Sequence, residues 1–183
     1  MQQDSPETHP FEAFVPDNIR CLIIGSFPGK DQTAPPIAED AWFYGAPKNQ
    51  FWKIMRIVYE LPLSTKTEKQ ALFREAGIGI TDIIHSCTRK HGTNLDENLE
   101  ICTYNNEVIQ DILQQFRPTV LFTSRFVEKL FRKFFPDYAP TALLPSPSPR
   151  YFRINIEQKA AVYRSLLPQL SSDKNRSRMV QTK

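Results

Sequence analysis

The sequence lacks any apolar run long enough to cross a bilayer, and it is poor in cysteine. No stretch approaches the roughly 18 consecutive apolar residues of a membrane-spanning helix. The N-terminus MQQDSPETHPFE is polar and acidic, unlike a signal or transit peptide, so we expect a cytoplasmic protein without membrane association. The three cysteines, Cys21, Cys87 and Cys102, form no CxxC pair, and we expect reduced thiols.

Fingerprints for metals and nucleotides are also missing. His85 and Cys87 lie near His91, but tetrahedral zinc needs four convergent ligands and nothing completes the set. GSFPGK at 25–30 follows an apolar run, yet it matches neither GxGxxG nor the P-loop pattern GxxxxGK(S/T). We therefore expect no metal site and no nucleotide bound through these motifs.

The composition is that of an ordinary globular domain. A length of 183 residues suits one domain with a full core, and 40% hydrophobic with 23% charged residues is typical of such proteins. The net charge of +3 permits nucleic-acid binding without requiring it. Fifteen prolines against six glycines indicate several rigid, extended turns, and LPSPSPR at 144–150 contains three of these prolines.

Short apolar runs alternate with amphipathic segments along the chain. The patterns predict strands at 20–27, 78–84, 117–124 and 141–146, and helices at 49–61, 65–77, 105–116, 125–135 and 155–170, with long loops at 30–48 and 85–100. Because the strands read as buried on both faces, we predict a three-layer α/β/α sandwich around a mainly parallel four-stranded sheet. We expect the domain to span 17–170, between a flexible lead at 1–16 and a disordered basic tail at 171–183.

The candidate site lies beyond the C-terminal ends of these strands, where ligands gather in parallel sheets. In FYGAPKNQFW (43–52), Phe51 and Trp52 are expected in the core, whereas the ring of Tyr44 or its neighbour could stack on a planar ligand. Asn49 either caps the following helix or serves the site, and Lys48 either meets a phosphate or is solvated. LPSPSPR is either a proline-rich turn or a phosphate-contacting loop with two hydroxyls and an arginine.

Taken together, these motifs resemble one protein family. GSFPG, FYGAPKNQFW, GITDIIHSCTR with NLDENL, and LLPSPSP occur in the order and spacing of the uracil-DNA glycosylase superfamily. Over about residues 20–168 the chain most closely resembles its hypoxanthine-DNA glycosylase branch, which is related to the mismatch-specific thymine/uracil glycosylases. The resemblance implies a monofunctional base-excision repair enzyme. Such an enzyme hydrolyses the N-glycosidic bond of a deaminated base (hypoxanthine, uracil or xanthine) flipped out of DNA. It also implies no cofactor, damaged double- or single-stranded DNA as partner, and action as a monomer.

The resemblance assigns roles to particular positions. Most of the superfamily place the water-positioning Asp or Asn in the first motif, where Phe27 stands here, but in the hypoxanthine branch that role falls to the residue matching Asn49. An amide is a poor general base, so the expected role is positioning. Tyr44 matches the ring that stacks on the flipped base. The remaining expected base contacts are Gly25, Ser26, Phe27, Pro28, Gly29 and Asp82, and the expected DNA contacts are Lys48, Pro145, Ser146, Pro147, Ser148 and Arg150.

Two departures leave alternatives open. Asp82 stands where some relatives carry a base-reading asparagine, and an ionised carboxylate accepts from an N–H but repels a carbonyl. Asp82 is then protonated, faces elsewhere, or meets a different substrate. Leu144 stands where many relatives carry a His or Asn that supports the departing base. The alternative function is a catalytically weak or inactive nucleic-acid-binding module of the same fold, and a third is a hydrolase of free nucleosides.

Overall fold

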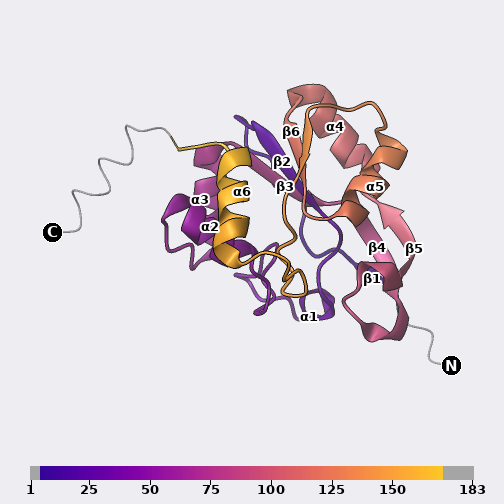
Figure 1. Ribbon diagram of the computed structural model, residues 1–183. Helices are drawn as coiled ribbons and strands as arrows, with labels where there is room; N and C mark the ends of the chain where they lie inside the picture. Colours follow the sequence, from indigo (N-terminus) through magenta and orange to yellow (C-terminus); the bar gives the residue numbers. More distant parts are fainter. Residues whose placement is uncertain (1–4, 171–183) are drawn as a thin grey trace.

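The computed structural model describes residues 5–170 (Figure 1). The elements are β1 Glu7–Thr8, β2 Cys21–Gly25, α1 Lys30–Thr33, α2 Phe51–Tyr59, α3 Lys66–Ala76, β3 Ile78–Asp82, β4 Ile84–Arg89, η1 Lys90–Gly92, η2 Asp96–Asn98, β5 Leu99–Tyr104, α4 Asn106–Phe116, β6 Thr119–Phe122, α5 Arg125–Phe134, β7 Thr141–Leu143 and α6 Ile156–Leu166. Within this described part, no helix is long and apolar enough to cross a membrane.

Four strands form a parallel sheet in the order β3-β2-β6-β7. Every residue of the central strand β2 is buried, with Cys21 and Ile23 in one hydrophobic cluster and Leu22 and Ile24 in the other. Because both faces are covered, such a strand is apolar throughout instead of alternating. The predicted α/β fold with a four-stranded parallel sheet between helical layers is confirmed.

Helices α2, α3 and α6 cover one face of this sheet, and α4 and α5 cover the other (Figure 1). On the first face, Phe51 and Trp52 of α2 pack edge to face and contact Tyr163 and Phe73 of the neighbouring helices. Phe51 and Trp52 are 0% and 5% exposed, which confirms their predicted place in the core. The core of this layer therefore lies directly beneath the start of α2.

The local sequence determines where α3 and β3 begin. The Thr65 hydroxyl accepts from the Glu68 N–H, and the Glu68 carboxylate accepts from the Thr65 N–H, which is a capping box. Gly77, with φ of 69°, ends the helix in the left-handed conformation that glycine adopts without strain. The chain enters β3 at the next residue, so a helix and a strand without an intervening loop hold Asp82 at the end of β3.

The segment 85–100 contains strands where a loop was predicted. β4 and β5 form an antiparallel pair that, with β1, makes a second sheet of order β1-β4-β5. No residue of β5 is buried, and two register shifts interrupt its pairing with β4. A strand that buries so little carries no apolar pattern, because burial is what selects apolar residues.

The N-terminal lead is packed on the domain wherever it is described. β1 pairs with β4, and the backbones of Phe14 and Ile80 exchange two hydrogen bonds of 2.9 Å. Residues 5–16 are thus part of the domain, which corrects the prediction of a flexible lead. The predicted basic tail at 171–183 lies outside the described residues.

Candidate active site

A cavity of about 680 Å³ lies beyond the C-terminal ends of β2, β3 and β6. This volume is within the range of small-molecule sites, which is about 300–1,000 Å³. The turn after β2, the loop before α2, the end of β3, the segment 89–99, the turn after β6 and the Ser–Pro loop all contribute to its walls. The structure therefore brings together loops whose residues are up to 125 positions apart in the chain, from Ser26 to Tyr151.

Most of the predicted site residues line this cavity. They are Ser26, Phe27, Pro28, Gly29, Tyr44, Lys48, Asn49, Asp82, Ser146, Pro147, Ser148 and Arg150. Gly25 lies just outside the lining, at the end of β2. Pro145 also lies outside it, and its carbonyl accepts from the Tyr163 hydroxyl at 3.0 Å. A direct contact of Pro145 with a ligand is thus not part of this geometry.

Asn49 sits at the start of α2 with its amide held in one orientation. Its Oδ1 accepts from the Phe51 N–H at 2.8 Å, which satisfies one of the free N–H groups at a helix start. No described residue hydrogen-bonds to its Nδ2, and the side chain lines the cavity. Asn49 precedes the N-cap residue Gln50, so its amide supports the start of α2 and still has two N–H donors and one lone pair to offer a ligand.

Tyr44 is held in the cavity wall by contacts on one ring face and at its hydroxyl. Its ring stacks on Phe51 with 4.3 Å between centroids and 17° between planes, and its hydroxyl donates to Thr123 Oγ1 at 3.1 Å. Burial raises the pKa of Tyr44 well above its ordinary value, and the negative charge of Asp82 adds to this. Since Phe51 covers one face of the ring, a planar ligand can stack only on the other.

Gly25 allows two polar groups to approach the end of β2. A Cβ at this position would lie 2.2 Å from Asp82 Oδ1 and 2.3 Å from the Tyr44 hydroxyl oxygen. Real Cβ atoms do not make contacts this short, so no side chain fits there. A carboxylate oxygen, a phenol and bare backbone thus meet at the end of β2, beside the cavity that Asp82 and Tyr44 line.

Asp82 is anchored at both its side chain and its backbone. It is 6% exposed, its Oδ2 accepts from His9 Nε2 at 2.8 Å, and its backbone oxygen accepts from Asn105 Nδ2 at 2.9 Å. Asp82 lines the cavity, so the possibility that it faces elsewhere is excluded. The sequence does not reveal this role of His9, because His9 lies 73 residues from Asp82 in a lead that carries no helical or strand pattern.

Arg89 fastens the turn after β2 to the second sheet. Its guanidinium is buried and donates to both carboxylate oxygens of Glu7 at 3.0 Å and to the Pro28 carbonyl at 2.9 Å. It also lies over the Phe27 ring, 5.7 Å from the centroid. Burial alone would raise the pKa of Glu7, but the hydrogen bonds and charge of Arg89, with a bond from Thr33, outweigh burial and hold that pKa below its ordinary value.

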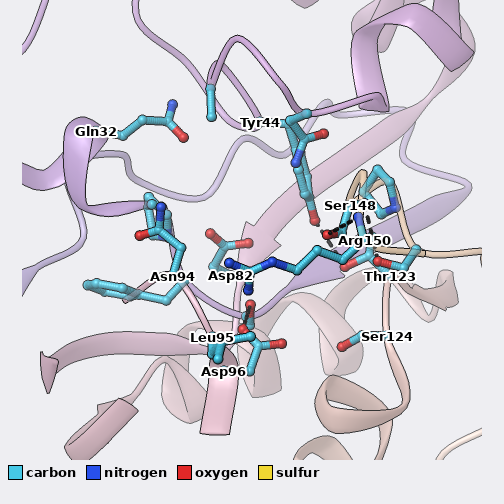
Figure 2. Close-up of a pocket in the computed structure, with 18 of the residues that line it drawn as sticks. Gln32, Tyr44, Asp82, Asn94, Leu95, Asp96, Thr123, Ser124, Ser148 and Arg150 are labelled. Carbon is cyan, nitrogen blue, oxygen red and sulfur yellow. Dashed lines mark hydrogen bonds between the residues drawn. The ribbon is translucent and has the colours of Figure 1, made fainter. Parts of the chain in front are cut away.

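The segment 89–99 supplies cavity residues that the motif analysis did not single out. Arg89, Asn94, Leu95, Asp96 and Leu99 line one wall, and Gln32, Thr123 and Ser124 come from other loops (Figure 2). Asp96 Oδ1 accepts from the Ser26 hydroxyl at 2.7 Å. Burial raises the pKa of Asp96, and the negative charge of Asp82 adds to the effect. The sequence signal for this wall was the motif NLDENL at 94–99, whose polar residues follow β4.

Arg150 and Lys159 connect the Ser–Pro loop to the rest of the site. Arg150 is exposed and extends from this loop across the cavity, toward the side that carries Asp82 and Asp96 (Figure 2). Lys159 is buried beneath the loop and donates to Gln50 Oε1 at 2.8 Å and to the Ser148 carbonyl at 3.3 Å. The loop is therefore tied to the residue next to Asn49.

The two apolar departures from the family pattern occupy different places. Phe27 lines the cavity, whereas Leu144 is 1% exposed and packs in the core between the sheet and α6. Across residues 5–170, no three His, Cys, Asp or Glu side chains are grouped so that they could hold a metal ion. The polar groups that line the cavity are amides, hydroxyls, two carboxylates, two guanidinium groups and one ammonium group.

Comparison with known proteins agrees with this geometry. The sequence model of the Uracil DNA glycosylase superfamily matches residues 12–170. A candidate uracil DNA glycosylase from Methanosarcina acetivorans, solved by NMR in solution, superposes with a TM-score of 0.65. The two are 19% identical, and the match covers 88% of this chain and 99% of that one, so it establishes a shared fold. Among curated proteins no relative matches.

Proposed function

The chain belongs to the uracil DNA glycosylase superfamily, and we propose that it is a monofunctional DNA glycosylase that removes a deaminated base from DNA. In the reaction, the bond between the sugar C1′ and the base nitrogen breaks, the oxygen of a water bonds to C1′, and the base leaves with a proton. The proposed substrate is hypoxanthine, with uracil and xanthine as the other candidates. The base must first be extruded from the stack, at a cost of a few kcal/mol.

One observation carries this proposal. A cavity with room for a nucleobase is lined by both the Ser26–Gly29 turn and Asn49, at the edge of the sheet where parallel α/β proteins bind ligands. If Asn49 pointed away from that turn, or if side chains filled the space between them, no nucleobase could be held there. The turn and Asn49 line the same cavity although they lie 20 to 23 positions apart in the chain.

Asn49 positions the attacking water or the sugar. Its orientation is set by the Phe51 N–H, so the groups it offers the cavity are fixed before a ligand arrives. Preorganisation of this kind lowers a barrier because no reorganisation is needed during the reaction. An amide cannot take a proton from water, and the role is therefore geometric.

Tyr44 and the Ser–Pro loop hold the base and the DNA strand. The free face of the Tyr44 ring supplies a stacking surface, with the other face supported by Phe51. Ser146, Ser148 and the exposed Arg150 offer hydroxyls and a guanidinium to phosphates beside the cavity. Lys48 adds a second positive charge to the same rim.

The test is a cleavage assay on DNA duplexes that carry a single hypoxanthine, uracil or xanthine. We expect abasic product, detected as strand breakage after alkali but not before it, from at least one duplex. Asn49→Ala should lower the single-turnover rate by about 100-fold or more, the usual size of effect when a preorganised polar group is removed. No abasic product from any duplex at stoichiometric enzyme would rule the proposal out.

Asn155→Ala is the matched control. Asn155 accepts from the Gln158 N–H at the start of α6 at 2.8 Å, as Asn49 accepts from the Phe51 N–H at the start of α2, but it does not line the cavity. Each substitution removes a side-chain acceptor from a helix start, at a cost of about 1 kcal/mol of stability. Only the Asn49 substitution should affect cleavage, which separates a loss of function from a loss of stability.

A second candidate, a nucleic-acid-binding module without turnover, is favoured by the apolar Phe27 in the cavity wall. It predicts salt-sensitive binding to damaged or abasic DNA, equal for the wild type and Asn49→Ala, with no cleavage by either. Release of a base from free nucleosides would instead indicate a small-molecule hydrolase. Duplex cleavage, DNA binding and nucleoside hydrolysis, measured together, therefore separate the three candidate functions.

A further inference from the structure

Asp82 is a buried carboxylate with one oxygen occupied and one open. The side chain is 6% exposed, and its Oδ2 takes the His9 N–H at 2.8 Å. Within residues 5–170, no donor hydrogen-bonds to Oδ1, which lies beside Gly25 and the Tyr44 hydroxyl on the cavity floor. A ligand that reaches the floor meets this open oxygen.

His9 determines the hydrogen-bonding character of that oxygen. The Phe11 N–H donates to His9 Nδ1 at 3.1 Å, so Nδ1 carries no proton and the proton is on Nε2, where it is donated to Asp82. The imidazole is held between the rings of Phe11, Phe27 and Phe43, with centroids 5.4–5.8 Å away. With the Nε2–H donated to Oδ2, Oδ1 is the carboxylate oxygen left to accept from a ligand.

We infer that Asp82, oriented by His9, reads the ring N–H of the flipped base and selects among bases by the groups on either side of that N–H. This inference rests on the proposed glycosylase function. Hypoxanthine presents its N1–H between one carbonyl and a C–H, whereas uracil, thymine and xanthine present a ring N–H between two carbonyls. Each neighbouring carbonyl repels the carboxylate. The site therefore favours the base with one such carbonyl over the bases with two.

Donors for the remaining carbonyl of hypoxanthine lie elsewhere in the lining. Asn94 Oδ1 accepts from the Lys30 N–H at 2.9 Å, which leaves the Asn94 Nδ2 group as a donor in the cavity wall. Arg150 extends across the cavity from the opposite side (Figure 2). An acceptor-only floor combined with donors in the walls is complementary to a base that carries one N–H and one carbonyl.

The pair of His9 and Asp82 includes a residue outside the family match. His9 precedes residue 12, where the match begins, and β1 holds it in place by pairing with β4. His9 is thus a positioning residue that acts through Asp82. Base selection in this chain depends on its N-terminal lead as well as on the shared motifs.

The decisive experiment compares single-turnover cleavage of hypoxanthine and uracil duplexes by the wild type and Asp82→Asn. The amide has nearly the same shape and can still accept from His9, but it places an N–H donor where Oδ1 stood. The donor now attracts a carbonyl, so the hypoxanthine-to-uracil rate ratio should fall by about 10- to 100-fold, the usual value of one matched polar contact. An unchanged ratio would overturn the inference.

Asp96→Asn removes an equal charge from the same cavity without altering the open oxygen of Asp82. An equal fall in the ratio for this variant would attribute the effect to net charge and would also overturn the inference. Failure of the wild type to cleave any duplex would instead be a failure of the proposed function. The two failures are therefore distinguishable in one set of assays.

Two His9 variants test the positioning role independently of Asp82. His9→Phe keeps a ring in the aromatic surroundings but removes the donor, and His9→Gln keeps an N–H donor without the ring. We expect His9→Phe to lower the hypoxanthine-to-uracil ratio and His9→Gln to restore it at least partly. A purely structural role would lower both rates together and leave the ratio as in the wild type, which would contradict this part of the inference.

Discussion

Replacing Arg89 by methionine should lower the free energy of unfolding by about 3–5 kcal/mol, the usual cost of removing one partner from a buried ion pair. The guanidinium donates to both oxygens of Glu7 and to the carbonyls of Pro28 and Thr93. Methionine fills a similar space but leaves a carboxylate and two carbonyls without these donors. Arg89 is 3% exposed, so water cannot readily replace it.

Urea unfolding followed by circular dichroism would measure this cost. For a domain of this size each kcal/mol lowers the melting temperature by about 2–4 °C, so the expected fall is about 6–20 °C. Glu7→Gln removes the charge from the other side of the pair. The double variant should lose less stability than the two single variants added together, because each single variant breaks the same interaction.

The Arg89 effect should also depend on pH. The pKa of Glu7 in the folded protein lies below its ordinary value of 4.5, so the stabilisation is fully present above pH 4.5. It is lost as the pH falls through the lowered folded-state pKa. The stability difference between the wild type and Arg89→Met should therefore shrink in acid. A loss under about 1 kcal/mol at neutral pH, as for an exposed ion pair, would refute the reasoning, as would an equal loss at both pH values.

Three further predictions concern single positions. Gly25→Ala should lower the free energy of unfolding by about 1–3 kcal/mol and impair cleavage, because its Cβ would lie 2.2 Å from a carboxylate oxygen. Gly29→Ala is the milder control, since its Cβ would meet no atom closer than 3.3 Å. Asp96→Asn should raise the free energy of unfolding at neutral pH. Because burial raises the pKa of Asp96 above its ordinary value of 3.8, ionisation of this carboxyl makes the folded protein less stable as the pH rises. A lower free energy of unfolding for the variant at neutral pH would contradict this. Leu144→Ala should cost about 2–5 kcal/mol in urea unfolding, as for a core leucine; a near-neutral result would place Leu144 outside the core.

Motifs and periodicity located most of the cavity. The buried strand 21–25, the amphipathic helix that starts after Asn49, and the proline-rich loop each have a local pattern, and twelve of the predicted site residues line one cavity. What these residues do stays a prediction. The local patterns succeeded because helix and strand periodicity records, within one segment, which side chains face the core.

The sequence by itself determined the layered fold, the four strands of the parallel sheet with helices α2 to α6, and the position of Asn49 at a helix start beside the sheet edge. Only the tertiary structure decided that His9 meets Asp82, that Arg89 reaches Glu7 and Pro28, and that Gly25 must be bare. These contacts join residues 19 to 82 positions apart in the chain. A buried ion pair leaves no periodic trace in either segment, because its partners are selected by each other and not by their neighbours in the chain.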